Sequence, residues 1–215
     1  MDPRPLNIGR IIESATCVAE GADWLTAREP RFAEALELCG PLPLRRRPDG
    51  FEALLSAIVG QQVSIASAAA IWKRLEEAGL TDADAVATAA PEALRAAGLS
   101  RPKIVYAQGL ARSGVDFEGL RTRPDEEVIA TLTAIKGIGV WTAEIYAMFA
   151  LGRADVFAAG DLALQEAARV LFELPERPSP AQLRAMAEDW SPWRAVAARL
   201  LWAYYRTIKQ REGIR

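Results

Sequence analysis

Residues that typically begin or end helices recur along this chain, and their spacing constrains its fold more than any other feature. Pro30 opens an apolar stretch that Gly40 closes, and Pro91 opens another in the same way. Thr81 and Ser100 precede helical stretches as N-cap candidates. No long run alternates between apolar and polar residues, as a half-buried strand would. The sequence therefore predicts an all-α fold of about ten short helices joined by tight loops.

The composition changes at one place, the segment 41–50 (PLPLRRRPDG). A loop rich in proline and arginine between helical stretches predicts a boundary between two lobes. We expect residues 1–49 to form a helical segment that packs on the C-terminal helices, and residues 50–215 to form the core. The three arginines of this loop, Arg45, Arg46 and Arg47, suit either a phosphate contact or a solvated surface.

Residue content excludes several classes of site. The 215 residues include no histidine and two cysteines, which removes histidine bases, histidine-ligated metals, four-cysteine zinc sites and iron–sulfur clusters. Cys17 and Cys39 lie in helical stretches, and we expect both to be buried thiols. Catalysis must therefore use carboxylates, amines, hydroxyls or backbone amides.

Charge and hydropathy also limit the partners. A formal net charge of −2 gives no global signal for nucleic acid, so any DNA contact has to be local. No apolar run approaches the length that spans a membrane, and the N-terminus lacks the pattern of a signal peptide. We expect no membrane partner and a cytoplasmic, nucleoid-associated location.

Two glycines interrupt a pair of apolar helical stretches in the string IKGIGVWTA. Glycine costs about 1 kcal/mol relative to alanine inside a helix, so Gly137 and Gly139 indicate a tight turn between two helices. Bare backbone at such a turn exposes N–H groups that suit a phosphate oxygen. An ordinary corner between helices would also need glycine, but the whole string favours a clamp on the DNA backbone, formed by Lys136, Gly137, Ile138, Gly139 and Val140.

This string resembles the helix-hairpin-helix DNA glycosylase superfamily, and the resemblance extends over roughly residues 50–205. It includes GQQVSIASAAAIW (60–72), GLSRPKIVYAQGLA (98–111) and VFAAGDLAL (156–164). The last helical stretch, WSPWRAVAARLLW (190–202), is similar to that of bacterial and yeast 3-methyladenine DNA glycosylases. The resemblance implies a two-lobed helical fold with an active-site cleft between the lobes. The inducible bacterial enzyme of this branch has an N-terminal β-rich domain, and we expect this chain to lack it.

The resemblance places the catalytic aspartate at Asp161. Cleavage of an N-glycosidic bond passes through a cationic sugar, and a nearby carboxylate stabilises that cation and orients the attacking water. The residues alone favour the simpler interpretation that Asp161 is a helix N-cap for the stretch that follows it, and the resemblance reverses that preference. Both roles are compatible in one carboxylate.

The resemblance also implies the chemistry at the base. Lyase-competent members carry a lysine where this chain has Trp141, which implies a monofunctional hydrolase with water as the nucleophile. Trp141 matches the alkylation-repair branch, and an indole face attracts a cationic base by about 0.5–2 kcal/mol. Trp202 matches a second pocket tryptophan, and Ile145 and Leu162 fall on two further pocket positions that are aromatic in the inducible bacterial enzyme. We expect Trp190 and Trp193 to be core residues.

Two further assignments follow from the resemblance. The base must leave the duplex stack to be reached, and a side chain of the GQQVS loop fills the gap. Here that side chain is Gln62, with Gln61 beside it, although both amides also suit helix capping. The hairpin of the superfamily often binds a monovalent cation, here through the main-chain carbonyls of Thr133, Ile135 and Ile138. We expect no other cofactor.

The sequence thus predicts a monomeric, monofunctional DNA glycosylase that removes alkylated purines such as 3-methyladenine from double-stranded DNA in base excision repair. One alternative is a glycosylase for a neutral lesion, hypoxanthine or uracil. Another is a non-catalytic module that binds damaged DNA through the same hairpin. Release of bases from methylated DNA separates these hypotheses.

Overall fold

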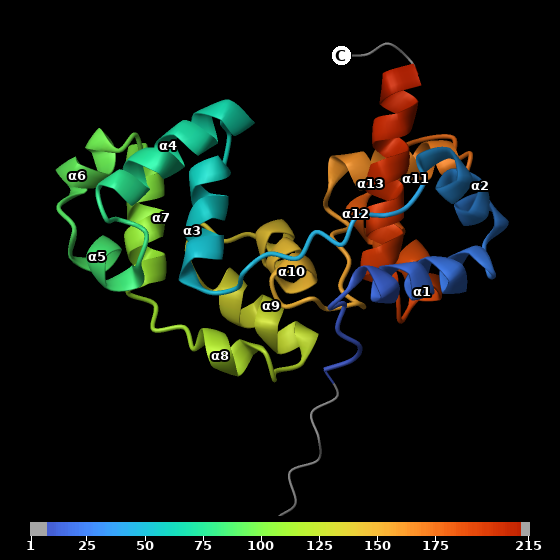
Figure 1. Ribbon diagram of the computed structural model, residues 1–215, viewed down its shortest axis with the longest axis horizontal. Helices are drawn as coiled ribbons and strands as arrows, with labels where there is room; N and C mark the ends of the chain where they lie inside the picture. The colour runs from blue at the N-terminus through green and yellow to red at the C-terminus, as the bar shows by residue number, and fades with distance from the viewer. Residues whose placement is uncertain (1–7, 212–215) are drawn as a thin grey trace, which may run out of the picture. The chain divides into compact units, whose positions relative to one another are not determined.

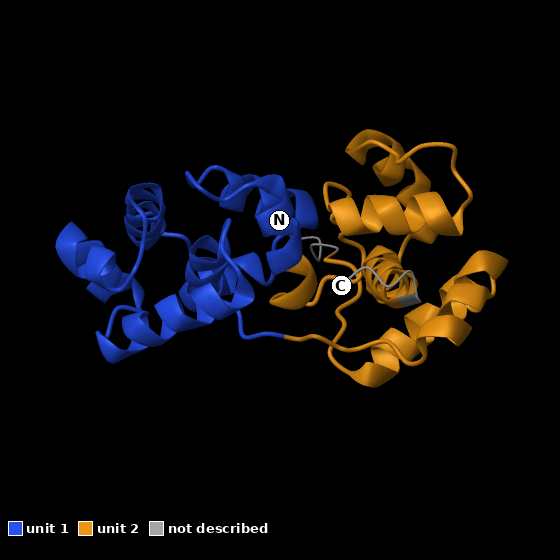
Figure 2. Ribbon diagram, turned by 90° about the horizontal axis from the view of Figure 1, so that it is seen from above, with its two compact units in different colours: residues 1–6, 47–146 blue, residues 7–46, 147–215 orange. Residues whose placement is uncertain are grey.

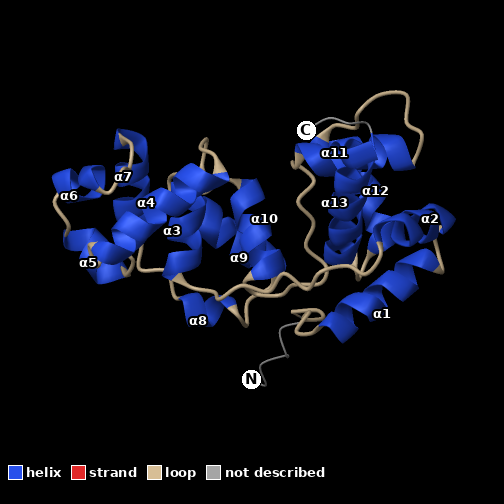
Figure 3. Ribbon diagram, turned by 45° about the horizontal axis from the view of Figure 1, so that its top comes forward, coloured by secondary structure: helices blue, strands red, loops and turns tan. Residues whose placement is uncertain are grey.

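The computed structural model describes residues 8–211, and in this range the chain is helical without a strand. One isolated antiparallel bridge joins Ile11 and Arg153. Figure 3 shows helices connected by loops throughout the described range. The all-α prediction is confirmed, although short helices make the elements more numerous than expected.

The described chain divides into two compact units, coloured separately in Figure 2. Unit 1 holds residues 47–146, and unit 2 holds residues 8–46 and 147–211. The division after Arg46 falls within the segment 41–50, where the composition changes. Unit 2 therefore combines an N-terminal and a C-terminal part of the chain, whereas the described residues of unit 1 form one continuous stretch.

Unit 1 is built around a central helix, α7 (Arg101–Ala111), which contacts three other helices of the unit (Figure 1). These are α3 (Phe51–Gly60), α5 (Ala83–Thr88) and α6 (Pro91–Ala96), and α3 also contacts α4 (Ile65–Glu77). The unit continues with α8 (Phe117–Leu120), α9 (Asp125–Thr133) and the beginning of α10 (Val140–Phe149). Leu54, Leu55, Ile58, Leu75 and Ala107 are buried in this unit.

Unit 2 is organised around α13 (Arg194–Arg211), the long helix of Figure 1. It contacts α11 (Leu162–Leu171), α1 (Ala15–Thr26), α2 (Pro30–Cys39) and the 3-10 helix η1 (Ala187–Trp190). The short helix α12 (Pro180–Met186) contacts α11 and η1. Alanines on the buried face of α13, Ala195, Ala197 and Ala198, let these helices approach closely. Trp190 and Trp193 are buried, as expected of core residues.

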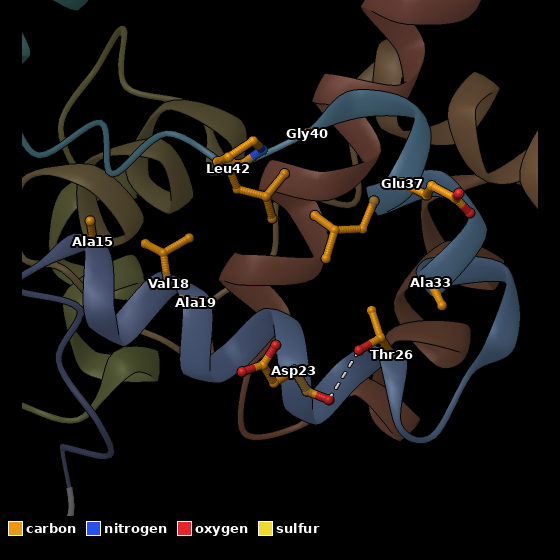
Figure 4. A pocket seen from close by; sticks show the side chains of 11 residues that line it. Ala15, Val18, Ala19, Asp23, Thr26, Ala33, Glu37, Gly40 and Leu42 are labelled. Atoms are coloured by element: carbon orange, nitrogen blue, oxygen red, sulfur yellow. Dashed lines mark hydrogen bonds between the residues drawn. The ribbon is translucent and has the colours of Figure 1, made fainter.

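A groove lies on unit 2 between α1 and α2, with a volume of about 710 Å³ (Figure 4). Its walls are mostly small or aliphatic side chains, among them Ala15, Val18 and Leu42. The hydroxyl of Thr26 donates to the carbonyl of Asp23 along one edge. The candidate catalytic and hairpin residues do not line this groove.

Several local expectations need correction. Asp82, not Thr81, caps α5, because its side chain accepts a hydrogen bond from the Ala85 N–H. The thiols Cys17 and Cys39 are half-buried rather than buried: Cys17 lies in the first turn of α1 and Cys39 is the last residue of α2. Within residues 8–211, no helix is both long enough and apolar enough to cross a membrane.

Candidate functional site

Gly137 makes the turn between α9 and α10 possible. Its φ of +96° lies in the left-handed region that side chains disfavour. A Cβ at this position would lie 2.4 Å from Cγ of Tyr106, which is on α7. Both the backbone conformation and the packing against Tyr106 therefore require glycine here.

Gly139 has a different reason to be glycine. A Cβ there would have nothing within 4 Å, and its φ lies outside the left-handed region. The Gly139 carbonyl accepts the N–H of Ala143, which begins the hydrogen bonding of α10. N–H groups in the first turn of a helix have no intrahelical acceptor, and Gly139 and Val140 are exposed there. No packing contact in the described chain requires glycine at this position, and its place before the first residue of α10 is one that glycine favours.

A polar cavity of about 550 Å³ lies beside this turn, entirely within unit 1. Gln61 and Gln62 line it together with the hairpin and the beginning of α7. The Gln61 amide donates to the carbonyl of Gly137 at 2.9 Å, which ties the α3–α4 loop to the hairpin. Gln62 is exposed and holds a φ of +55°, uncommon for a residue with a side chain. Because the Gln61 amide is already hydrogen-bonded to the hairpin, Gln62 is the better candidate for the side chain that fills the gap left by an extruded base.

Lys103 also lines this cavity, and it is not among the site residues predicted from the sequence. It is buried, and its Nζ donates to the Val59 carbonyl at 2.7 Å, near the C-terminal end of α3. Burial lowers the pKa of this amine. A cation on the last carbonyls of a helix is favourable, and here it anchors the base of the Gln62 loop. The only sequence signal for Lys103 was its position within GLSRPKIVYAQGLA, a stretch that resembles the superfamily.

Asp161 caps α11 and also contacts α13. Its Oδ1 accepts hydrogen bonds from the N–H groups of Ala163 at 2.9 Å and Leu164 at 3.1 Å. The indole Nε1–H of Trp202 donates to the same oxygen at 3.2 Å. Two of the predicted site residues, Asp161 and Trp202, are therefore brought together inside unit 2. Leu162, which follows the aspartate, is 63% exposed.

The other two predicted pocket residues are on α10, in the part that belongs to unit 1. Trp141 is 47% exposed, a large exposure for an indole, and Ile145 is half-buried. Their spacing of four residues places both side chains on one side of the helix. Nearly half of the Trp141 surface is therefore open to solvent.

The turn also contains the carbonyls predicted to hold a monovalent cation. The Ile135 carbonyl already accepts the N–H of Ile138 at 3.0 Å, and the Thr133 hydroxyl donates to Ile129. The cation remains a prediction. Across residues 8–211 there is no group of three or more Cys, Asp or Glu side chains arranged to hold a metal ion.

Comparisons with known proteins give the geometry a context. Residues 55–192 match the family described as HhH-GPD superfamily base excision DNA repair protein. DNA-3-methyladenine glycosylase 1 of Schizosaccharomyces pombe is 28% identical over 209 residues, which cover 92% of each chain. The crystal structure of a DNA-3-methyladenine glycosidase from Bacillus halodurans superposes with a TM-score of 0.80 at 35% identity, covering 94% of each chain. The Schizosaccharomyces pombe 3-methyladenine DNA glycosylase in complex with abasic DNA gives a TM-score of 0.73 at 29% identity, covering 85% of this chain and 95% of that one.

Proposed function

The chain belongs to the HhH-GPD superfamily of base excision DNA repair proteins, and we propose that it is a monofunctional DNA glycosylase for alkylated purines such as 3-methyladenine. The similar proteins from Schizosaccharomyces pombe and Bacillus halodurans are named for 3-methyladenine, which supports this substrate class. The observation that carries the proposal is the Asp161 carboxylate, held by two backbone N–H groups and the Trp202 indole.

Asp161 supplies negative charge to the reaction. As the bond between base and sugar breaks, positive charge develops on the sugar ring. A carboxylate fixed in advance stabilises that charge without reorganising, and it orients a water molecule for attack on the sugar carbon. The three donors to Oδ1 come from two helices, so the carboxylate keeps one orientation during the reaction.

We expect water, rather than an amine of the protein, to be the nucleophile. Trp141 occupies the position where lyase-competent members carry lysine. Lys103 is buried against the Val59 carbonyl, and Lys136 belongs to the exposed turn. Base removal therefore leaves an intact strand with an abasic site.

An alkylated purine suits a protein without histidine. Alkylation at N3 or N7 makes the base cationic, so it leaves without a general acid. The indole face of Trp141 attracts such a base by stacking and by cation–π interaction, on the order of 0.5–2 kcal/mol. A neutral lesion such as hypoxanthine or uracil would be a poorer leaving group without a general acid and would lack the cation–π attraction.

The hairpin binds the backbone of double-stranded DNA, and the chain acts as a monomer. N–H groups around Gly139 and Val140 hold a phosphate, and the contact is independent of base sequence. Gln62 fills the gap that the extruded base leaves.

Replacement of Asp161 by asparagine tests the proposal. Asp161→Asn keeps the size and most of the capping capacity but removes the charge, so single-turnover release of 3-methyladenine should fall by roughly 100-fold or more. Affinity for a duplex with an abasic-site analogue should persist, with an unchanged circular dichroism spectrum. Asp82→Asn is the matched control, because Asp82 also caps a helix. A folded Asp161→Asn protein with nearly full activity would reduce Asp161 to a helix cap, and release of hypoxanthine or uracil alone would favour the neutral-lesion alternative.

A further inference from the structure

Arg199 is a buried cation that the proposed chemistry does not use. It is on α13 with a side chain that is 1% exposed, and burial together with the nearby Arg45 and Arg46 lowers its pKa to about 10. The guanidinium is therefore charged at neutral pH. A buried charge is costly to fold, and an aliphatic side chain of similar size would avoid that cost.

The contacts of Arg199 fix its guanidinium in one plane. Nε and Nη2 donate to the Leu44 carbonyl at 3.3 and 3.1 Å, and Nη1 donates to the Ala195 carbonyl at 2.8 Å. The central carbon lies 4.7 Å from the centroid of the Phe149 ring. A planar guanidinium can donate hydrogen bonds along its edges while its face lies against an aromatic ring, and neither lysine nor leucine can do both.

Phe149 lies between Arg199 and Trp202, the residue that donates to the Asp161 carboxylate. Its ring is buried at the end of α10, with its centroid 5.8 Å from that of Trp202 and the planes inclined by 35°. Trp202 is one helical turn after Arg199 on α13 and donates its indole N–H to Asp161. A continuous row of contacts thus runs from Arg199 through Phe149 and Trp202 to Asp161, inside unit 2.

We propose that Arg199 is a positioning residue for Asp161, acting through Phe149 and the indole of Trp202. The inference rests on the proposed role of Asp161. The guanidinium sets the plane of the Phe149 ring, and that ring supports one face of the Trp202 indole. The indole N–H is then held toward the Asp161 Oδ1, so loss of Arg199 loosens the carboxylate without removing a group from the site.

The first test needs no enzymatic activity. Protein labelled with ¹⁵N-tryptophan gives indole N–H signals for its six tryptophans, and Trp202→Phe identifies the signal of Trp202. Arg199→Met should shift this signal and speed its hydrogen exchange, and Phe149→Leu should do the same if Arg199→Met does not fold. Arg206→Met is the control, because Arg206 is exposed on the same helix. An unmoved Trp202 signal in a folded Arg199→Met or Phe149→Leu protein would overturn the inference.

The second test measures coupling. Misplacement of a catalytic group costs about 10- to 100-fold in rate, so Arg199→Met should slow single-turnover release of 3-methyladenine by about 10-fold or more. Binding to abasic-analogue DNA should be retained. In a Trp202→Phe background the same substitution should change the rate by less than about 2-fold, because the route to Asp161 is already cut. Losses that multiply across the two backgrounds would refute action through Trp202. A wild-type protein that releases no alkylated base would refute the proposed function instead, while the indole signal would still decide the role of Arg199.

Discussion

Alanine should have different effects at the two hairpin glycines. Gly137→Ala should destabilise the fold, whereas Gly139→Ala should weaken DNA binding. Gly137→Ala forces an L residue into left-handed backbone, at about 1–2 kcal/mol. It also drives a Cβ to 2.4 Å from the Tyr106 ring, and overpacking of this kind costs about 1–3 kcal/mol. The sum, about 2–5 kcal/mol, corresponds to a melting temperature lowered by roughly 4–20 °C in a chain of this size.

Gly139→Ala should leave the fold nearly intact and weaken DNA binding. The new methyl group meets nothing within 4 Å in the protein, and alanine in place of glycine at a helix N-cap costs about 1 kcal/mol or less. On the DNA side, a hydrogen bond to a charged group is worth about 1.5–3 kcal/mol, so one lost phosphate contact lowers affinity by about 10-fold or more.

The assay pairs thermal unfolding with fluorescence anisotropy on a duplex that carries an abasic-site analogue. Gly109→Ala is the control, since Gly109 is an exposed glycine of the same unit whose added Cβ also meets nothing. The reasoning fails if Gly139→Ala binds as tightly as the wild type, because the hairpin backbone would then not face DNA. It also fails if Gly137→Ala melts at the wild-type temperature.

Three further outcomes are expected. Trp141→Ala should reduce the preference for 3-methyladenine over normal adenine by roughly 2- to 30-fold, measured as a ratio of release rates, with little change in affinity for undamaged DNA. Borohydride should trap no covalent protein–DNA adduct, because trapping requires an amine nucleophile, and a trapped adduct on a denaturing gel would contradict the monofunctional assignment. The pKa of Arg199 is lowered to about 10, so above that pH the unfolded chain binds more protons at this residue than the folded chain does, and its destabilising contribution fades. Any stability advantage of Arg199→Met in denaturant titrations should therefore shrink between pH 9 and pH 11, values that bracket this pKa.

The helical class and the hairpin were predictable from the sequence because their signals are local. Proline, glycine and capping residues act on their immediate neighbours, so Pro30, Gly40 and Pro91 mark helix ends reliably. The sequence was less informative where adjacent residues compete for one role. Thr81 and Asp82 are both good N-caps, and only the structure shows which side chain reaches the Ala85 N–H.

The two glycines of the hairpin look equivalent in sequence, but only one of them is required by the fold. Gly137 is constrained by Tyr106, which precedes it by about 30 residues and reaches it through the packing of α7. No local pattern reports such a contact. The same holds for Lys103 and Val59, and for Arg199 and Leu44, whose partners are distant in sequence.

The division of the chain suggests which measurements should change together. The hairpin, the Gln61 hydrogen bond to it and the Lys103 hydrogen bond to Val59 all lie in unit 1, and in the proposed function these features hold the DNA. Asp161 and the row of contacts behind it lie in unit 2, and in the proposed function they act on the reacting sugar. Substitutions in the first group should therefore lower affinity for abasic-analogue DNA, whereas substitutions in the second should lower the single-turnover rate at saturating protein. If binding and chemistry are separable in this way, a variant from each group should combine with additive free energies, and strong coupling between the two variants would show that they are not.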